Sequence, residues 1–323
     1  MGYYLGIDGG GTKTEALVTD EKGVVVSALK GDASNPHFAG KDTALSNLRC
    51  IIMLAIKDID KKNIRKVILC VPGIKEYRHE LNKMISIDED RTVFYGDELN
   101  TFVGALARDY GVTVLAGTGS FVIGMDKTGR KCTIGGWGPI IGDPGSGYWM
   151  AVQALRAVAM EYDGLLEHTI LTDRIKEYYS IENINNLKRV VSMNNISPIA
   201  ALVKEAAQEE DRQAISIVQE AAQRLAEMAG IVIDRLGLDN KDYSLALTGG
   251  ISNFGELIMR PFIDTLRQKY RNIDIVKPLF TPVVGAVMLA MREDDIGWDE
   301  DILNNLKISY GKAGITNVNR PVF

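Results

Sequence analysis

The N-terminal third of the chain alternates between short apolar runs and glycine-rich turns, which is typical of strands joined by hairpins. A helical spacing of apolar residues replaces this pattern in three stretches. We predict strands over 3–8, 14–19, 24–29, 67–71 and 92–95. We predict helices over 41–59, 76–84 and 99–108. This order of elements indicates a mixed α/β domain.

The pattern then restarts with a strand, a small-residue turn and a second strand. Residues 148–236 are predicted to be almost entirely helical, and the apolar stripe over 215–236 fits either a core face or a dimer face. The last long helix is predicted over 283–291. The remaining elements are strands over 112–116, 121–125, 131–134, 245–248 and 273–276, and a helix over 253–270.

Two self-similar halves predict two related domains whose loops line a shared cleft. The first is expected over 1–111 and the second over 112–323. The second carries the helical insertion, and its last helix is a candidate for packing back on the first domain.

Composition narrows the class of protein. The chain has 323 residues, of which 46% are hydrophobic, and this fits a globular protein of about two domains. A net charge of -5 without a basic run argues against nucleic-acid binding.

No apolar run is long enough to predict a membrane span, and no secretory signal is evident. Three scattered cysteines suit a reducing cytosol, so a cytoplasmic location is expected. The acidic run 293–295 is expected to be a solvated helix end.

The first glycine cluster, Gly6–Thr14, fails two known phosphate motifs. Thr12 between Gly11 and Lys13 breaks the spacing of a P-loop. Thr14 stands where a dinucleotide fingerprint needs its last glycine, and a strand rather than a helix follows.

What remains is a tight turn between two strands, whose bare backbone N–H groups can approach a polyphosphate. The candidate phosphate ligands are Gly10, Gly11, Thr12, Lys13 and Thr14. The Lys13 side chain can point toward the ligand or into solvent. Asp8 at the strand end is a candidate magnesium ligand. An ordinary hairpin explains the same residues without a ligand.

Two later turns are also rich in glycine and also follow a predicted strand. Gly117, Thr118 and Gly119 join two predicted strands, while Gly249 and Gly250 join a strand to a helix. The turn at 117–119 would form a second phosphate loop. Gly249 and Gly250 would let an adenosine lie against the backbone. Three such turns together indicate a nucleotide site more strongly than any one of them.

Six motifs resemble one family in order along nearly the whole chain. The sequence resembles the BadF/BadG-type ATPase group, which contains N-acetylglucosamine kinase, of the sugar kinase/Hsp70/actin superfamily. The resemblance implies two ribonuclease-H-like, actin-like ATPase domains around a central ATP cleft. The motifs are GIDGGGTKT (6–14), ASNPHF (33–38), GDELN (96–100), GTGS (117–120), GGWGPIIGDPGSGYW (135–149) and LTGG (247–250).

The resemblance also implies roles for single residues. Asp97 resembles the catalytic base that accepts the proton of the sugar hydroxyl. Thr12 and Thr118 resemble phosphate contacts, and Gly249 and Gly250 the adenosine site. The sugar-binding set is Asn35, Asp97, Ser120, Gly136, Trp137, Gly138 and Asp143.

Each role has a plain structural alternative. Asp97 can merely cap the helix that follows it. Trp137 can be part of the core, and Asp143 can be a turn residue before Pro144.

The resemblance implies an ATP- and Mg²⁺-dependent kinase that phosphorylates an amino sugar such as N-acetylglucosamine, at the 6-hydroxyl. It also implies a homodimer with ATP and the sugar as its small-molecule partners. Two alternatives stay open: an ATPase activator of an acyl-CoA dehydratase or reductase, and a non-catalytic sugar sensor. The first needs paired cysteines for an iron–sulfur cluster, which Cys50, Cys70 and Cys132 do not resemble.

Overall fold

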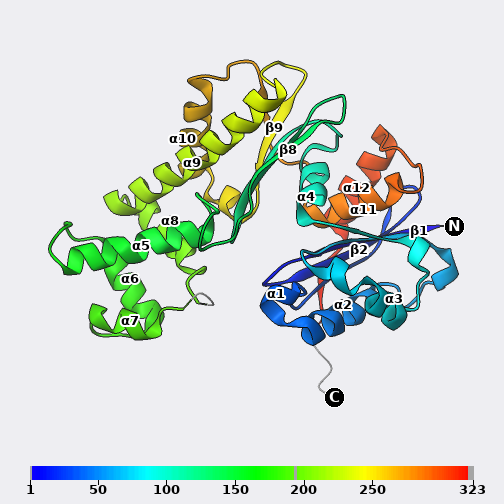
Figure 1. The fold of residues 1–323 in the computed structure, drawn as a ribbon, viewed down its shortest axis with the longest axis horizontal. Coiled ribbons are helices and arrows are strands. Elements are labelled where there is room, and N and C mark those ends of the chain that lie inside the picture. The colour runs from blue at the N-terminus through cyan, green and yellow to red at the C-terminus, as the bar shows by residue number, and fades with distance from the viewer. Residues whose placement is uncertain (1, 193–194, 319–323) are drawn as a thin grey trace. The chain divides into compact units, whose positions relative to one another are not determined.

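The computed structural model describes residues 2–192 and 195–318 (Figure 1). Its chain forms two compact units. The first consists of the described residues of Met1–Arg108 and Pro278–Phe323, and the second of those of Asp109–Lys277. Within the described residues, no helix is long and apolar enough to cross a membrane.

The first unit is built on a six-stranded sheet of order β11-β3-β2-β1-β4-β5. The first three strands form an antiparallel meander, and β4 and β5 continue parallel to β1. Its strands are β1 (Tyr3–Gly9), β2 (Thr14–Asp20), β3 (Val25–Gly31), β4 (Ile64–Cys70), β5 (Thr92–Tyr95) and β11 (Thr316–Asn317).

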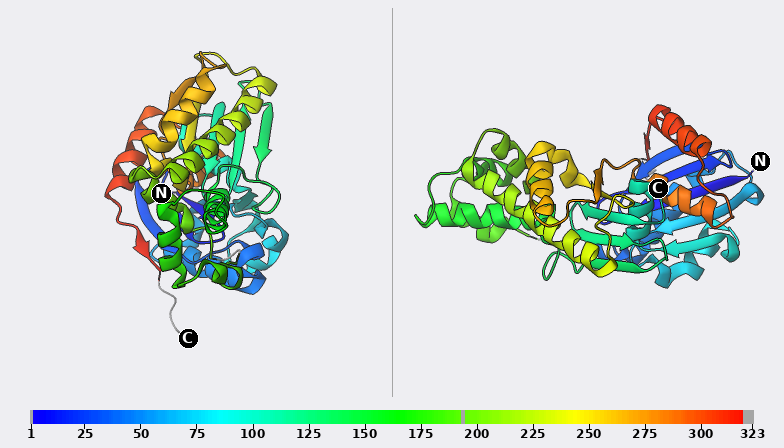
Figure 2. Two further views of the ribbon diagram at one scale, coloured as in Figure 1. Left: turned by 90° about the vertical axis from the view of Figure 1, so that its left-hand side faces the viewer. Right: turned by 90° about the horizontal axis from the view of Figure 1, so that it is seen from above.

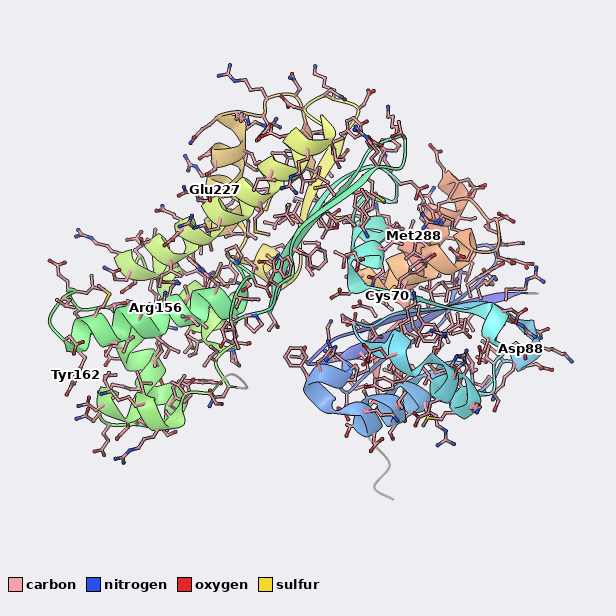
Figure 3. All side chains as sticks on the ribbon, in the orientation of Figure 1. Cys70, Asp88, Arg156, Tyr162, Glu227 and Met288 are labelled. Carbon is pink, nitrogen blue, oxygen red and sulfur yellow. The ribbon has the colours of Figure 1, made fainter. Side chains whose placement is uncertain are left out.

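Helices pack on both faces of this sheet, as alternation along β1 requires. Leu5 and Ile7 belong to the core that α2 covers, whereas Gly6 between them lies under α11. Met288 of α11 and Cys70 of β4 are both fully buried in this unit (Figure 3). The helices are α1 (Pro36–Ala39), α2 (Lys41–Ala55), α3 (Arg78–Ile85), α4 (Asp97–Leu106), α11 (Pro282–Arg292) and α12 (Glu300–Lys312).

The second unit repeats the strand order of the first. Its sheet runs β10-β9-β6-β7-β8, so that three antiparallel strands are again followed by two parallel ones. This order matches β5-β4-β1-β2-β3, and the expected α/β fold of two related halves is confirmed. The strands are β6 (Gly111–Ala116), β7 (Ser120–Met125), β8 (Lys131–Gly135), β9 (Ser244–Thr248) and β10 (Asp274–Val276).

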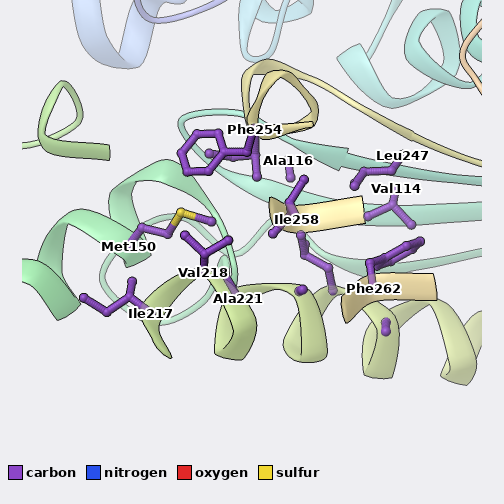
Figure 4. Close-up of a cluster of buried hydrophobic side chains, with 14 of the residues drawn as sticks. Val114, Ala116, Met150, Ile217, Val218, Ala221, Leu247, Phe254, Ile258 and Phe262 are labelled. Atoms are coloured by element: carbon purple, nitrogen blue, oxygen red, sulfur yellow. The ribbon is translucent and has the colours of Figure 1, made fainter. Parts of the chain in front are cut away.

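The helical part of the second unit forms a large core against its sheet. Long helix α9 lies beside α10 (Figure 2) and packs on β6, β7 and β8. Its Ile217, Val218 and Ala221 join Val114 and Phe262 in one buried cluster (Figure 4), so the apolar stripe of this helix is a core face. The helices are α5 (Gly147–Tyr162), α6 (Ile170–Tyr179), α7 (Leu187–Val190), α8 (Ile199–Gln208), α9 (Arg212–Leu236) and α10 (Glu256–Arg267).

The C-terminal segment belongs to the first unit. The second unit ends at Lys277 rather than continuing over 112–323, and the helix named as a candidate for packing back on the first domain, α11, packs on β1. Helix α12 also follows what was expected to be the last long helix. Its Ile302 and Leu306 cover the turn at Gly23, where a Cβ atom would lie 2.9 Å from the Ile302 carbonyl oxygen.

The acidic run 293–295, expected to be solvated, instead fixes the end of α11. The hydroxyl of Tyr4 donates to Asp294 at 2.7 Å, and the hydroxyl of Tyr95 donates to Glu293 at 2.6 Å. Arg65 adds an ion pair to Asp294 at 3.0 Å. These contacts join α11 to β1, β4 and β5.

Helices α4 and α11 meet through two glycines. A Cβ atom on Gly104 would lie 2.7 Å from the Thr281 carbonyl oxygen, and one on Gly285 would lie 2.7 Å from the Gly104 nitrogen. Both separations are too short for a side chain, so the two helix backbones touch. The contact fixes the position of α4, whose first residue is Asp97.

We therefore expect Gly285→Ala to destabilise the protein by about 2–4 kcal/mol, because overpacking forces backbone shifts. Gly311→Ala is the matched control, since this glycine also lies in a helix but has open space around its Cβ position. That control should gain up to about 1 kcal/mol from helix propensity. Urea unfolding of both variants measures the difference, and equal stabilities would refute the close contact.

Candidate functional site

The candidate residues of the first unit gather at one edge of its sheet. Asp8 is paired with Cys70, and Cys70 with Tyr95, in the parallel ladder of β1, β4 and β5. The carboxyl ends of these strands therefore lie together, and Asp97 follows directly after β5. Asp97 is close enough to Asp8 for its charge to raise the pKa of the Asp8 carboxyl.

Asp97 is not the cap of α4. The cap position is held by Gly96, which has no side chain, and Asp97 is the first helical residue. Capping therefore does not explain why an aspartate stands there. A carboxylate in the first turn of a helix is stabilised by the helix dipole, which favours the ionised form that a general base needs.

Asp8 is partly buried, and its Oδ1 accepts a hydrogen bond from the Asn100 side chain at 2.8 Å. Burial, together with the charges of Glu15 and Asp97, raises the pKa of Asp8 to about 7, although the Asn100 hydrogen bond and Lys13 lower it. A bound cation would relieve this unfavourable charge.

The donor set near Asp8 fits magnesium better than a metal held by protein alone. Within the described residues, no group of three His, Cys, Asp or Glu side chains could hold a metal ion. Magnesium is usually bound through one or two carboxylates, with water and substrate phosphates as its remaining ligands. Asp8 could serve as such a single carboxylate.

The first glycine turn is exposed over Gly11, Thr12 and Lys13, and its ends are joined by a hydrogen bond from the Gly10 nitrogen to the Lys13 carbonyl at 3.0 Å. Lys13 forms an ion pair of 2.7 Å with Glu15 on β2. Its charge is therefore partly neutralised by the protein.

Thr14, expected to be a phosphate ligand, has a structural role instead. The residue is fully buried. Its hydroxyl donates to the Asp32 carbonyl at 2.6 Å and lies 2.7 Å from the Ser34 hydroxyl. Both partners come from the segment after β3, so Thr14 fastens that segment to β2 and has no group left for a phosphate.

The side chain of Asn35 uses its oxygen in a hydrogen bond within the protein, and its nitrogen is available for a ligand. It caps α1, and its side-chain oxygen accepts from the His37 backbone nitrogen at 2.9 Å. Its own backbone nitrogen donates to the Gly10 carbonyl at 3.1 Å, which joins the candidate sugar and phosphate segments. The side-chain amide nitrogen is the group that can contact a sugar.

In the second unit, two of the predicted glycine turns lie side by side. The parallel pairing of Leu115 with Thr248 brings the ends of β6 and β9 together. A Cβ atom on Gly117 would lie 4.0 Å from the Gly250 nitrogen. Gly249 has a φ of 95°, a left-handed conformation that favours glycine.

The first amides of α5 are already used by the turn at 117–119. The Gly147 nitrogen donates to the Gly117 carbonyl at 2.8 Å, and the Tyr148 nitrogen donates to the Thr118 carbonyl at 3.2 Å. Thr118 itself is exposed and remains a candidate phosphate contact.

The glycine-rich loop after β8 is held by Asp143 and Ser120. Asp143 is buried and accepts a hydrogen bond from the Gly138 nitrogen at 3.2 Å. Burial raises its pKa, while the amides of Gly138, Ser120 and neighbouring residues lower it. A Cβ atom on Gly119 would lie only 2.5 Å from the carboxylate, so the glycine makes room for it.

Two of the expected sugar ligands therefore serve the loop itself. Ser120 is buried, its hydroxyl donates to the Pro144 carbonyl at 2.8 Å, and its carbonyl accepts from Gly136 at 2.9 Å. Asp143 has a φ of 55°, and its carboxylate already accepts a backbone N–H. Both residues shape the loop before any sugar arrives.

Trp137 belongs to neither core. Its exposed fraction is 74%, and those of Ile140 and Ile141 in the same loop are 75% and 76%. Three large exposed apolar side chains on a pinned loop favour contact with a ligand over a packing role. Trp137 remains a candidate wall for a sugar ring.

We expect Asp143→Asn to weaken sugar binding, raising KM for the sugar about 10-fold, because the amide nitrogen would face backbone donors and loosen the loop. Asparagine tolerates the left-handed backbone, so the substitution changes the carboxylate without straining the chain. Steady-state kinetics measures both KM values, and KM for ATP should not change.

Asp126→Asn is the matched control for this variant. Asp126 is also buried and accepts backbone hydrogen bonds, from Thr128 and Arg130, but in the hairpin between β7 and β8. It should lose stability and keep the KM for sugar. A similar KM increase in both variants would contradict a specific role of the Asp143 loop.

Asn100 ends the GDELN motif, and its sequence context alone assigns it no role. Its link to Asp8 could not be predicted from spacing, because the two residues lie on different elements.

A cavity of about 770 Å³ also lies in the first unit, beside β3 and the end of α12, and it contains none of the candidate site residues.

Comparison with known proteins identifies relatives over nearly the whole chain. An N-acetylmuramic acid/N-acetylglucosamine kinase from Clostridium acetobutylicum is 30% identical, over 91% of this chain and 100% of its own length. An N-acetyl-D-glucosamine kinase from Dictyostelium discoideum is 27% identical, over 90% and 98%. The crystal structure of a putative N-acetylglucosamine kinase from Chromobacterium violaceum, 22% identical, superposes with a TM-score of 0.72 over 90% of this chain and 99% of that one.

The sequence model of the BadF/BadG/BcrA/BcrD ATPase family matches residues 5–290. This range contains every candidate site residue of both units. The chain therefore belongs to the BadF/BadG/BcrA/BcrD ATPase family.

Proposed function

We propose that this protein is an ATP-dependent sugar kinase that transfers the γ-phosphate to the 6-hydroxyl of an amino sugar such as N-acetylglucosamine. The observation that carries the proposal is the position of Asp97. Its carboxylate lies at the carboxyl edge of the first sheet, in the first turn of α4 and near Asp8. The kinases to which the chain is similar support the class of reaction.

In the proposed reaction, Asp97 accepts a hydrogen bond from the sugar hydroxyl and takes its proton as the oxygen attacks the γ-phosphorus. The bond from that phosphorus to the bridging oxygen breaks, and ADP leaves. Asn35 of the first unit would hold the sugar through its amide nitrogen. In the second unit, the exposed Trp137 is a candidate apolar contact for a sugar ring.

In the first unit, the turn at Gly10–Lys13 would bind phosphate through its backbone N–H groups. In the second unit, the turn at 117–119 is a candidate for the same kind of contact. The adenosine would lie against Gly249 and Gly250. Magnesium supplies charge neutralisation for the phosphates when it is bound, and Asp8 is the residue we propose to hold it. Thr14 and Ser120 support these segments rather than contacting the substrates.

The test is an ADP-release assay over a panel of N-acetylglucosamine, glucosamine, N-acetylmuramic acid and glucose. We expect turnover with at least one amino sugar, and phosphorus–proton NMR coupling should place the product phosphate on the 6-hydroxyl. Turnover with glucose alone would contradict the amino-sugar proposal. Sugar binding without turnover would instead favour a sensor.

We propose that the protein is a cytoplasmic homodimer. Sedimentation velocity at micromolar concentration tests the dimer through the mass of the particle. The dehydratase-activator alternative requires an iron–sulfur cluster, and Cys70 is fully buried. An iron-free, colourless protein with kinase turnover would exclude it.

A further inference from the structure

Asn100 is a fully buried polar residue that joins three elements of the first unit. Its side-chain nitrogen donates to Asp8 Oδ1 on β1 at 2.8 Å and to the Pro282 carbonyl at the start of α11 at 3.2 Å. Asn100 itself lies on α4, one turn after Asp97. The Asn100 side chain thus connects β1, which carries Asp8, and α4, which carries Asp97, with α11, which packs on both.

The orientation of this amide is fixed by its surroundings. Both of its partners, the Asp8 carboxylate and the Pro282 carbonyl, are hydrogen-bond acceptors, so the nitrogen must face them. Turning the amide over would bring its oxygen against two other oxygens. The side chain can therefore only donate at this place.

The arrangement has a cost in stability. The Asn100 side-chain oxygen is buried and has no hydrogen-bond partner among the described residues. An unpaired buried acceptor destabilises the fold, a cost that an apolar side chain of the same size would avoid. Packing alone therefore does not favour asparagine, whereas a donor aimed at Asp8 does.

The backbone of Asn100 is held as firmly as its side chain. The glycine contact between α4 and α11 brings Gly285 against the Asn100 carbonyl. Asp8 has no further hydrogen bond to its carboxylate within the described part of the chain, so Asn100 is the group that sets its orientation.

We propose that Asn100 is a positioning residue, which holds one oxygen of Asp8 so that the carboxylate can bind the divalent cation of the nucleotide. The inference rests on the proposed function for the identity of that cation as the one that accompanies ATP. Residues that hold a metal-binding carboxylate through a hydrogen bond typically affect metal affinity by about 10–100-fold.

The test is Mn²⁺ binding in the presence of ADP, measured on the full chain from the electron paramagnetic resonance of free Mn²⁺. We expect Asn100→Leu to raise the Kd for Mn²⁺ about 10-fold or more. Asn100→Ala provides a second variant that leaves room for water if leucine disturbs packing. Wild-type Mn²⁺ affinity in a folded Asn100 variant would overturn the proposal.

Asn82→Leu is the matched control. Asn82 on α3 is also a buried asparagine whose side-chain oxygen lacks a partner within the described residues, where no hydrogen bond links it to Asp8. It should keep wild-type Mn²⁺ affinity, and a similar loss there would overturn a specific role for Asn100. Because the readout needs no sugar turnover, an Asn100-dependent Mn²⁺ site would stand even if the kinase assay failed.

Discussion

Asp97→Asn should lower kcat for sugar phosphorylation by about 10²–10⁴-fold, the range that a general base contributes. The amide keeps the size of the side chain but cannot accept the proton of the hydroxyl. Nucleotide binding should persist, because the candidate phosphate and adenosine segments lie elsewhere in the chain. A coupled kinase assay measures kcat, and calorimetry with a non-hydrolysable ATP analogue measures binding.

Asp42→Asn is the matched control for this prediction. Asp42 also lies in the first turn of a helix of the first unit, α2, but it is exposed and has no proposed role. Both variants lose the same favourable interaction with a helix dipole, about 0.3–1 kcal/mol. Only Asp97→Asn should lose turnover. Wild-type kcat in that variant would remove Asp97 from the mechanism.

The positions of the strands in both units could be predicted in part, because hairpins and buried strands follow local patterns. The glycine turns predicted from sequence do lie at strand ends, and 117–119 lies beside Gly249 and Gly250. Helix α12 could not be predicted, because it buries only Ile302 and Leu306 and its apolar stripe is correspondingly weak. The sequence does offer the helix over 283–291 as a candidate for packing on the first domain, but the contacts of α11 with β1 join residues far apart in the chain.

The roles of single side chains at the candidate site could not be predicted from the sequence either. A threonine beside a glycine turn can face a ligand or a neighbouring strand, and only the structure shows that Thr14 bonds to Asp32 and Ser34. The same holds for Ser120, whose hydroxyl is used by Pro144. Sequence motifs predict which segments form a site, and the hydrogen-bond partners of each side chain then limit which of its groups could contact a substrate.

Asp8→Asn should stabilise the protein at pH 8 without metal and at the same time abolish measurable kinase activity. The pKa of Asp8 is raised from 3.8 to about 7 in the folded state. Below both values the carboxyl is protonated in folded and unfolded chains alike, and it costs nothing. As the pH rises from about 4 to 7, the unfolded chain ionises first, so the wild type loses stability, by at most about 4 kcal/mol above pH 7.

Asparagine avoids this penalty, because it is neutral at every pH and its oxygen can still accept the Asn100 hydrogen bond. The stability gained by Asp8→Asn should therefore grow by roughly 2–3 kcal/mol between pH 5 and pH 8, which urea unfolding at both pH values measures. Asp126→Asn is a control of opposite sign. Hydrogen bonds from Thr128 and Arg130 hold the pKa of Asp126 well below its usual range, so that variant should lose stability at pH 8.

Magnesium separates the structural cost of Asp8 from its proposed role. With ADP present, Mg²⁺ should raise the unfolding midpoint of the wild type, because a ligand that binds only the folded state stabilises it. The same addition should leave Asp8→Asn nearly unchanged. An Asp8→Asn variant that is less stable than the wild type at pH 8 would show that burial does not destabilise the Asp8 carboxylate. Wild-type turnover in that variant would show that the cation does not need this carboxylate. Asp8 is therefore expected to weaken the metal-free fold and yet to be needed for turnover.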